Sequence, residues 1–384
     1  MTHSDNTFID IHVLQTVPPS CINRDDTGSP KSAVYGGVKR ARVSSQAWKR
    51  ATRSVFRDSL DESELGERTL KLVDRIAKRI RDLDPDRDET ASVQLANKVL
   101  SASGIKVKVE KKKTKDDSDE NTAEEHKTGY LVFLSRAQIE ALAELAANAP
   151  DGEFSKSEAQ KALKGASSID VALFGRMIAD APELNVDAAC QVSHAISVHE
   201  VVSEFDYFTA VDDNAPEDNA GAGMIGTVEF NSSTLYRYAT IDAVRLSENL
   251  GSKEAAVRAV DAFIRAFILS MPTGKQNTFA NRTRPGFVMV QVRSDQPTNL
   301  VGAFEDPVRP DADGGVLSAA AVELLEFAEA GDKAYGTHPV IDAEMVADPR
   351  ALKMLRSKGA DSSIGLDELV STAVEATRSR LVGE

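Results

Sequence analysis

A strongly basic segment near the start of the chain places the strongest constraint on what this sequence can fold into. Between residues 24 and 57, nine lysines and arginines stand against two aspartates, a net charge of +7 in a chain whose net charge is −14. Solvated surfaces usually mix both signs, so this concentration of cations predicts a surface that binds a polyanion. An exposed basic helix without a ligand is the alternative. The cations are Arg24, Lys31, Lys39, Arg40, Arg42, Lys49, Arg50, Arg53 and Arg57.

The second half of this segment is expected to be an amphipathic helix. Ser44 or Ser45 is a suitable N-cap, and the helix should extend to about Phe56. At about 100° per residue, the cations and one amide share a sector opposite the tryptophan. The helix should therefore bury its tryptophan side and expose a cationic stripe. The stripe consists of Gln46, Lys49, Arg50, Arg53 and Arg57, and the opposite side of Trp48, Ala51 and Val55.

A glycine pair precedes the helix. Gly36-Gly37 predicts a turn that can bring backbone N–H groups close to an anion. Together with the fixed cations and the helix N-terminus, this turn is expected to form a track for phosphate groups.

Composition places the chain among ordinary globular proteins. Its 384 residues predict two or three domains, and 41% hydrophobic residues suffice for real cores. Residues 1–20 lack the features of a signal peptide, and no apolar run approaches the ~20 residues that span a bilayer. Cys21 and Cys190 cannot build a disulfide framework or a cysteine-based zinc site, so we expect both to be reduced, in the cytoplasm.

Hydrophobic periodicity predicts an α+β fold with a ferredoxin-like core. Alternation over Phe8–Leu14 predicts a first strand with one buried face, and two more strands are expected over Ser168–Met177 and Cys190–Val202. The aromatic run Phe205–Val211, with a return through Phe230, predicts a long β-hairpin. Further strands are expected at 130–134, 235–241 and 286–292, and helices at 63–83, 93–100, 136–147, 253–271, 317–329 and 342–381. Residues 58–165 read as a mostly helical insertion.

A lysine block followed by an acidic block occupies residues 106–127. This composition is typical of a solvated hairpin tip or a mobile insert. Its lysines could contact nucleic acid, but neutralisation by the neighbouring carboxylates is the favoured interpretation.

Several motif matches fail on their context. Residues Gly221–Gly226 match the dinucleotide fingerprint G-x-G-x-x-G, but an acidic loop precedes them and a strand-like run follows, so a hairpin tip is favoured. His199-Glu200 begins a zinc-protease motif whose second histidine is absent, and Lys275 lacks the first glycine of a P-loop. The acidic pairs Asp25-Asp26 and Asp212-Asp213 have no nearby third ligand, which disfavours a metal site.

These features together favour binding of single-stranded nucleic acid. Phosphates would lie along the cationic stripe, and aromatic side chains of the hairpin would wedge against exposed bases. Phosphate contacts carry no sequence preference, so many sequences would be accepted.

Five runs of the sequence resemble the CasC-type backbone subunit of type I-E CRISPR Cascade, in the repeat-associated RNA-binding superfamily. The resemblance covers most of residues 7–292 in the same order. The runs are FIDIHVLQTVPPSCINRDD, YGGVKRARVSSQAWKRATR, IDVALFGRM, FDYFTAVDD and LYRYATI.

The resemblance implies an RNA-recognition-motif palm, helical fingers and a β-hairpin thumb. The palm would comprise residues 1–57, 168–200 and 233–384 with the C-terminal helices, the fingers 58–167 and the thumb 201–232. Copies would stack head to tail along the CRISPR RNA spacer, and the guide would pair with invading target DNA in antiviral defence. The other implied partners are the large, small and two end-capping Cascade subunits and a recruited helicase–nuclease. The chain itself would need no cofactor and no metal and would not be an enzyme.

The resemblance also implies which residues hold the guide. Family positions that bind guide phosphates in the palm correspond to Lys31, Ser44, Gln46, Lys49 and Arg53, and Arg24 lies in a loop of the same motif. The positive charge of the basic segment adds Arg40, Arg42 and Arg50. The family's nucleotide-displacing positions correspond to Met177 and Phe208, and a further guide-contacting loop corresponds to Lys275 and Gln276.

Two other functions remain open at this stage. Related backbone subunits cut RNA with an aspartate of the corresponding loop, so a metal-dependent ribonuclease would use Asp26 or Asp25, with substrate phosphates completing Mg²⁺ coordination. An ion pair between Arg24 and these aspartates is the structural alternative. A dinucleotide-dependent enzyme would rest on Gly221–Gly226 alone.

Overall fold

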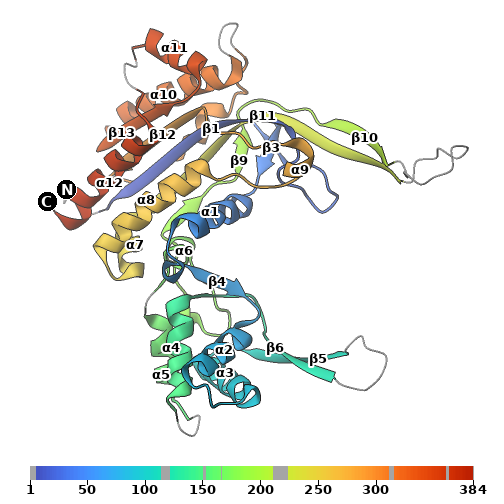
Figure 1. The fold of residues 1–384 in the computed structure, drawn as a ribbon. Coiled ribbons are helices and arrows are strands. Elements are labelled where there is room, and N and C mark those ends of the chain that lie inside the picture. Colours follow the sequence, from blue (N-terminus) through green and yellow to red (C-terminus); the bar gives the residue numbers. More distant parts are fainter. Residues whose placement is uncertain are drawn as a thin grey trace, which may run out of the picture. The chain divides into compact units, whose positions relative to one another are not determined.

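The computed structural model of the protein describes residues 6–113, 122–149, 153–165, 167–210, 224–310, 315–359 and 363–383. The chain divides into two compact units (Figure 1). Unit 1 comprises Met1–Phe56, Gln191–Val244 and Val260–Glu384, and unit 2 comprises Arg57–Cys190 and Arg245–Ala259. No helix among the described residues is long and apolar enough to cross a membrane.

Unit 1 is built on a large antiparallel sheet with the strand order β13-β12-β1-β11-β9-β3-β2, and β8 and β10 pair with β11. Helices pack on this sheet, so the predicted α+β class is confirmed. The strands are β1 (Phe8–Ser20), β2 (Ser32–Tyr35), β3 (Val38–Val43), β8 (Cys190–Val192), β9 (Ala195–Ser197), β10 (Glu204–Ala210), β11 (Met224–Asp242), β12 (Phe287–Arg293) and β13 (Ile341–Val346). The helices are α1 (Ser45–Ser59), α8 (Lys253–Leu269), α9 (Gln276–Phe279), α10 (Gly315–Tyr335), α11 (Pro349–Ser357) and α12 (Leu366–Val382), with a 3-10 turn at Leu300–Phe304.

The central strand β1 is buried on both faces, which corrects the prediction of one buried face. Ile9, Ile11 and Val13 lie on one side, and the polar residues Asp10 and His12 on the other are equally inaccessible. The reason is the long helix α10, which packs on the face that alternation assigns to solvent.

This second face contains a buried polar network. Tyr238 donates to Asp10 (2.9 Å), and His12 Nδ1 lies 2.9 Å from the Tyr236 hydroxyl. Burial raises the pKa of Asp10 to about 6 and lowers the pKa of His12 to about 3. His12 is therefore neutral at physiological pH, and the alternation of apolar and polar residues in this strand reflects an internal network.

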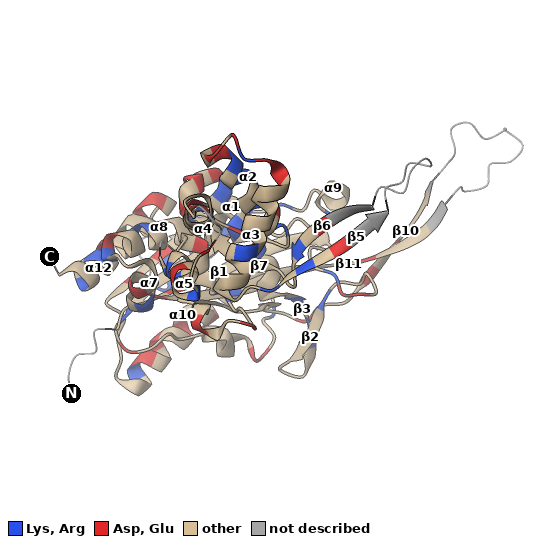
Figure 2. Cartoon of the chain, turned by 90° about the horizontal axis from the view of Figure 1, so that it is seen from below, with Lys and Arg blue, Asp and Glu red and all other residues tan. Residues whose placement is uncertain are grey.

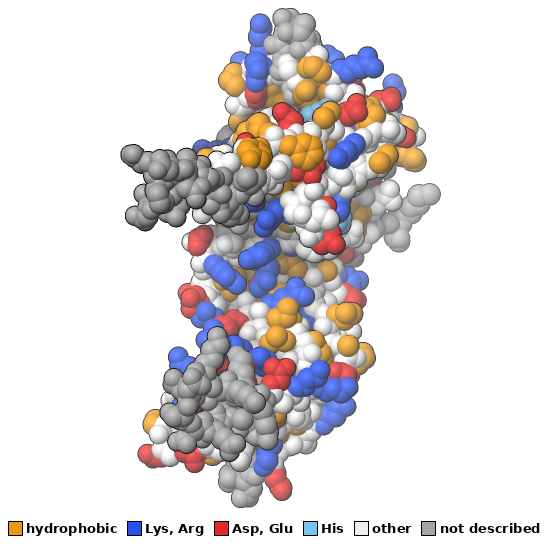
Figure 3. Space-filling model, turned by 90° about the vertical axis from the view of Figure 1, so that its right-hand side faces the viewer, with side chains coloured by type: hydrophobic (Ala, Val, Ile, Leu, Met, Phe, Trp, Pro, Cys, Tyr) orange, Lys and Arg blue, Asp and Glu red, His pale blue; other side chains and the backbone are white. Residues whose placement is uncertain are grey.

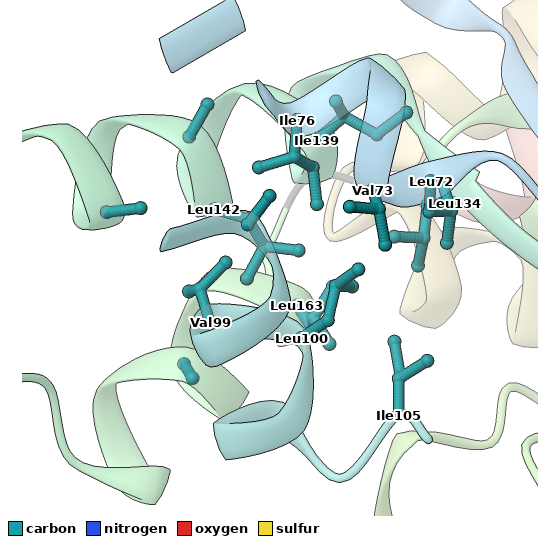
Figure 4. Close-up of a cluster of buried hydrophobic side chains, with 14 of the residues drawn as sticks. Leu72, Val73, Ile76, Val99, Leu100, Ile105, Leu134, Ile139, Leu142 and Leu163 are labelled. Atoms are coloured by element: carbon teal, nitrogen blue, oxygen red, sulfur yellow. The ribbon is translucent and has the colours of Figure 1, made fainter. Parts of the chain in front are cut away.

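Unit 2 is mostly helical. Its helices α2 (Leu72–Leu83), α3 (Glu89–Ser103), α4 (Arg136–Ala147) and α5 (Lys156–Lys164) bury a shared apolar cluster, part of which Figure 4 shows. Its other elements are α6 (Ile169–Phe174), α7 (Ala243–Leu250), the strand pair β4 (Gly66–Thr69) and β7 (Val132–Ser135), the hairpin β5 (Val107–Lys113) and β6 (Thr122–Thr128), and 3-10 turns at Glu62–Glu64 and Pro182–Leu184.

Four predicted elements differ from the structure. The strand expected over Cys190–Val202 is divided into β8 and β9 and ends at Ser197. Ser168–Met177 is not a strand: it contains the short helix α6, because an apolar run of this length does not distinguish a strand from a buried helix. The helix expected from Ser63 begins at Leu72, after strand β4. The helix expected over 342–381 is interrupted, since β13 occupies Ile341–Val346 as the edge strand of the sheet.

Both predicted hairpins are confirmed, although their tips lie outside the described residues. In the lysine-rich hairpin, Lys127 pairs with Glu110 and Glu125, so its two signs partly neutralise each other (Figure 2). In the aromatic hairpin, β10 pairs with β11 from Glu204 onward. Residues Met224–Gly226 of the dinucleotide-like motif belong to strand β11, so no helix begins there to receive a pyrophosphate.

Candidate nucleic-acid interface

Helix α1 has the amphipathic structure that the sequence predicts. The Ser44 hydroxyl accepts a hydrogen bond from the Ala47 amide (3.3 Å), which identifies Ser44 as the N-cap. Trp48, Thr52 and Phe56 are buried, whereas Ala51 and Val55, which the sequence assigned to the buried side, are half-buried. The stripe lies on the accessible side, where Gln46, Arg50 and Arg57 are exposed and Lys49 and Arg53 are half-buried.

A buried arginine positions the inner side of this helix. The Arg237 guanidinium lies 3.8 Å from the centre of the Trp48 ring, donates to Gln15 Oε1 of β1 (2.6 Å) and donates to the Phe267 carbonyl of α8. Burial lowers the pKa of Arg237 to about 9, which leaves it cationic at neutral pH. One side chain therefore links α1, β1 and α8, and it holds the stripe at a fixed place on the sheet.

The loop before β2 brings other predicted residues to the start of α1. The side-chain oxygen of Asn23 accepts a hydrogen bond from the Ser44 amide (2.9 Å), and the backbone carbonyl of Asn23 accepts one from the Lys31 amide (2.9 Å). The Lys31 carbonyl in turn accepts the Arg42 amide (2.9 Å). Lys31, Arg42 and Ser44 are thus adjacent in space, and Arg24 is exposed in the same loop. We call Arg24, Lys31, Arg42 and the stripe of α1 the basic track.

Arg42 shows how the track keeps its positive charge. Its guanidinium donates to the Ser32 carbonyl (3.2 Å) and lies 3.0 Å from Nδ1 of His194. Burial and the cations Arg42 and Lys31 lower the pKa of His194, so its ring is neutral and Nδ1 can accept from Arg42. A neutral acceptor orients Arg42 without cancelling its charge.

Arg40 was predicted to bind RNA, and the structure corrects this prediction. It is fully buried, and its guanidinium donates to the carbonyls of Tyr35, Ser197, Phe304 and Glu305 at 2.9–3.2 Å. Because these carbonyls occupy its donors, Arg40 braces the β2–β3 hairpin and has no surface left for a phosphate.

The predicted glycine turn exists and is exposed, but Gly36 lies against another segment of the protein. Gly36 and Gly37 join β2 to β3 with positive φ angles of 59° and 78°. A Cβ on Gly36 would lie 1.6 Å from the Glu305 carbonyl oxygen. Gly36 therefore permits the close approach of another backbone segment, whereas Gly37 borders open space, and binding of an anion at this turn stays a prediction.

Asp25, one of the two aspartates of the loop, stabilises the loop itself. Asp25 Oδ1 accepts from the Thr27 hydroxyl (2.7 Å) and from the amides of Thr27 and Ser29 (both 3.0 Å). These hydrogen bonds, first that of the Thr27 side chain, lower the pKa of Asp25. Among the described residues Arg24 makes no ion pair, so the predicted pairing with the aspartates is wrong, and no group of metal-ligating side chains is found there.

The two predicted base-displacing residues both reach the surface. Met177 follows α6 in unit 2 and is 80% exposed. Phe208 lies on β10 in unit 1, 37% exposed, directly opposite Gly226. A Cβ on Gly226 would lie 2.4 Å from the Phe208 ring, so the absent side chain provides the space in which the ring lies across the hairpin. The pattern of aromatic residues did not identify this glycine.

Lys275 and Gln276 begin α9, in the loop between α8 and β12. Gln276 is exposed and Lys275 is half-buried. The Cβ of an alanine at Gly274 would lie 2.2 Å from the Ile22 carbonyl oxygen, so this loop packs tightly against the loop that contains Arg24. Sequence reasoning missed two exposed arginines in the same loop, Arg282 and Arg284, although the absence of acidic residues from 270 to 286 would have marked them.

The surface distribution of charge agrees with a local cationic interface on an acidic protein. On the face drawn in Figure 3, blue lysine and arginine side chains gather in groups, some without a neighbouring red carboxylate. Such groups attract polyanions locally, while the overall negative charge opposes unspecific adhesion elsewhere.

Comparison with known proteins adds independent information. The family described as CT1975-like protein matches residues 9–372. A chain of a solved structure named "CRISPR RNA-guided surveillance complex, pre-nicking" is similar, with 34% sequence identity, a TM-score of 0.81, and coverage of 96% of this chain and 100% of that one. A chain of a second structure, named "CRISPR RNA-guided surveillance complex", has 31% identity, a TM-score of 0.71, and coverage of 96% and 99%. No curated protein matches.

Proposed function

Since the chain belongs to the CT1975-like protein family, we propose that it is the repeated backbone subunit of a CRISPR RNA-guided surveillance complex. The observation that supports this role is the basic track, in which cations from a loop, a strand and a helix are attached to one folded body by Asn23 and Arg237. Such a surface binds the phosphates of a strand and leaves its bases free to pair.

The proposal extends to the finer features of a type I-E assembly. Copies of the chain stack head to tail along the spacer, with the β10–β11 hairpin as the thumb and Phe208 and Met177 displacing guide nucleotides. An aromatic ring and an unbranched methionine fill the space beside an unstacked base well. The other Cascade subunits cap or flank this filament, and a recruited helicase–nuclease destroys the target.

The test is co-expression with the partner subunits and a CRISPR array, followed by purification and extraction of nucleic acid. We expect RNA of one discrete length, recovered with the chain in a large assembly. Recovery of the chain as an RNA-free monomer would refute the backbone role.

We also propose that the chain does not cut RNA. Replacing Asp26 by alanine is expected to leave the length and amount of the recovered guide unchanged, because no carboxylate cluster accompanies Asp26 in the described residues. Asp25→Ala is the companion variant, since Asp25 closes its own loop and its loss tests a structural effect. A longer RNA in the Asp26→Ala sample, sized on a denaturing gel beside the wild type, would instead favour the metal-dependent ribonuclease.

A further inference from the structure

The loop that joins α8 to β12, residues 270–286, is a second basic element of unit 1. It contains Lys275, Arg282 and Arg284 and no acidic residue. Arg282 and Arg284 are exposed and make no ion pair with any part of the chain that the structure describes. We call this segment the α9 loop.

The backbone of the α9 loop is held in a costly conformation. Lys275 and Ala280, at the two ends of α9, have positive φ angles of 52° and 47°. They are the two non-glycine residues with positive φ in the described part of the chain, and this left-handed conformation is unfavourable for any residue with a Cβ. Buried Asn281 stabilises it by donating to the Gly274 carbonyl (3.2 Å). Strain of this kind persists only where the surroundings impose it.

The two arginines project from an anchored stretch. Between them, Thr283 donates its hydroxyl to the Thr16 carbonyl (2.8 Å) and accepts from Gln15 Nε2 at both its carbonyl (3.0 Å) and its hydroxyl (3.2 Å). Arg237, which supports α1, also donates to Gln15. The backbone of the α9 loop is therefore connected to Trp48 of α1 through two side chains, Gln15 and Arg237.

The exposure pattern directs both guanidinium groups outward. Arg282 and Arg284 are exposed, whereas Thr283 is half-buried and Pro285 is buried. Because the backbone between the two arginines is already anchored, binding orders their side chains alone and no loop, which favours binding.

The neighbours of the α9 loop place it beside the proposed guide-binding surface. Phe279 of α9 packs against Phe230 of β11, with ring centres 5.8 Å apart, at the base of the β10–β11 hairpin. On another side, Gly274 abuts Ile22, next to the loop that contains Arg24. The α9 loop thus contacts both the base of the hairpin and the start of the basic track (Figure 1).

We propose that Arg282 and Arg284 bind the phosphodiester backbone of a nucleic-acid strand, as a second cationic edge next to the basic track. A guanidinium presents paired donors that match phosphate oxygens. The inference rests on the proposed function, and the strand is either the guide RNA or the target DNA paired with it.

The test uses the complete complex that contains Arg282→Gln and Arg284→Gln. A double variant Arg356→Gln with Arg378→Gln removes the same charge from exposed positions on α11 and α12, which Figure 1 shows away from α9. Guide content per complex and the affinity for single-stranded target DNA are measured over a range of salt concentrations. We expect one of the two to fall about tenfold relative to the control, with a shallower salt dependence.

The measurements also identify the bound strand. A lower guide content assigns the arginines to the guide RNA, and unchanged guide content with weaker target binding assigns them to the target DNA. Equal values for the variant and the control in both measurements would overturn the inference. If the wild type contains no RNA, the proposed function fails by itself. The role of the two arginines is then tested by measuring the affinity of the isolated chain for labelled oligouridine. Equal affinities of the variant and the control would again refute the inference.

Discussion

Replacing Lys49 and Arg53 by glutamate is expected to remove guide RNA from the assembly. Both residues lie on the accessible side of α1, and the change converts two cations of the basic track into two anions. Repulsion of phosphates by two fixed carboxylates costs at least about 3 kcal/mol per copy, or roughly a hundredfold in affinity. Because every copy of a filament carries the same change, the loss is repeated along the guide. The measurement is the amount of RNA extracted per chain after co-purification.

The matched control reverses charge elsewhere on unit 1. Lys353→Glu with Arg356→Glu changes two exposed cations on one face of α11 and alters the net charge by the same amount. We expect this control to retain the guide. Both proteins should melt within a few degrees of the wild type, since the Trp48 side of α1 is untouched. Equal RNA recovery from the two variants would show that the stripe is not the guide-binding surface.

Local patterns in the sequence predicted the elements that determine this surface. The 3.6-residue periodicity identified α1 and the burial of its tryptophan, and serine chemistry limited its N-cap to Ser44 or Ser45, of which the structure uses Ser44. The aromatic run identified the β10–β11 hairpin. These features succeed because each depends on neighbours within a few positions of the chain.

The failures depend on residues that are far apart in the sequence. Arg40 and Arg42 lie two positions apart on β3 and look equivalent in the sequence. The segment Phe304–Glu305 and the Ser197 carbonyl cover Arg40, whereas Arg42 lies next to His194 at the surface. Nothing within the basic segment distinguishes the two arginines, because the covering backbone is contributed by β9 and the turn before α10.

Burial of β1 on both faces is a failure of the same kind. A polar residue at every second position predicts contact with water, but Asp10 and His12 have partners on β11. Arg237 was equally invisible, since a lone arginine within a predicted strand gives no sign that it stacks on a tryptophan 189 positions earlier. The sequence therefore located the cations, and only the fold shows which of them are buried and stabilise the structure.

Replacing Trp48 by alanine is expected to destabilise unit 1 more than any change on the stripe. The indole is 1% exposed, and its removal opens a cavity between α1 and the sheet and takes away the ring on which Arg237 rests. Truncation of a buried tryptophan costs about 3–5 kcal/mol, which corresponds to roughly 5–10 °C in melting temperature. Thermal unfolding followed by circular dichroism measures the effect.

The variant Trp48→Phe distinguishes the contribution of the aromatic face from that of the indole volume. Phenylalanine keeps an aromatic face for the guanidinium of Arg237, and the indole N–H that it loses has no hydrogen-bond partner among the described residues. We therefore expect this variant to recover more than half of the stability lost in Trp48→Ala and to retain guide RNA, since the cations of the stripe stay in place. If Trp48→Ala melts within 2 °C of the wild type, the Arg237–Trp48 contact does not hold α1 on the sheet. If Trp48→Phe is as unstable as Trp48→Ala, the stabilisation comes from indole volume, and the cation–π contact contributes little.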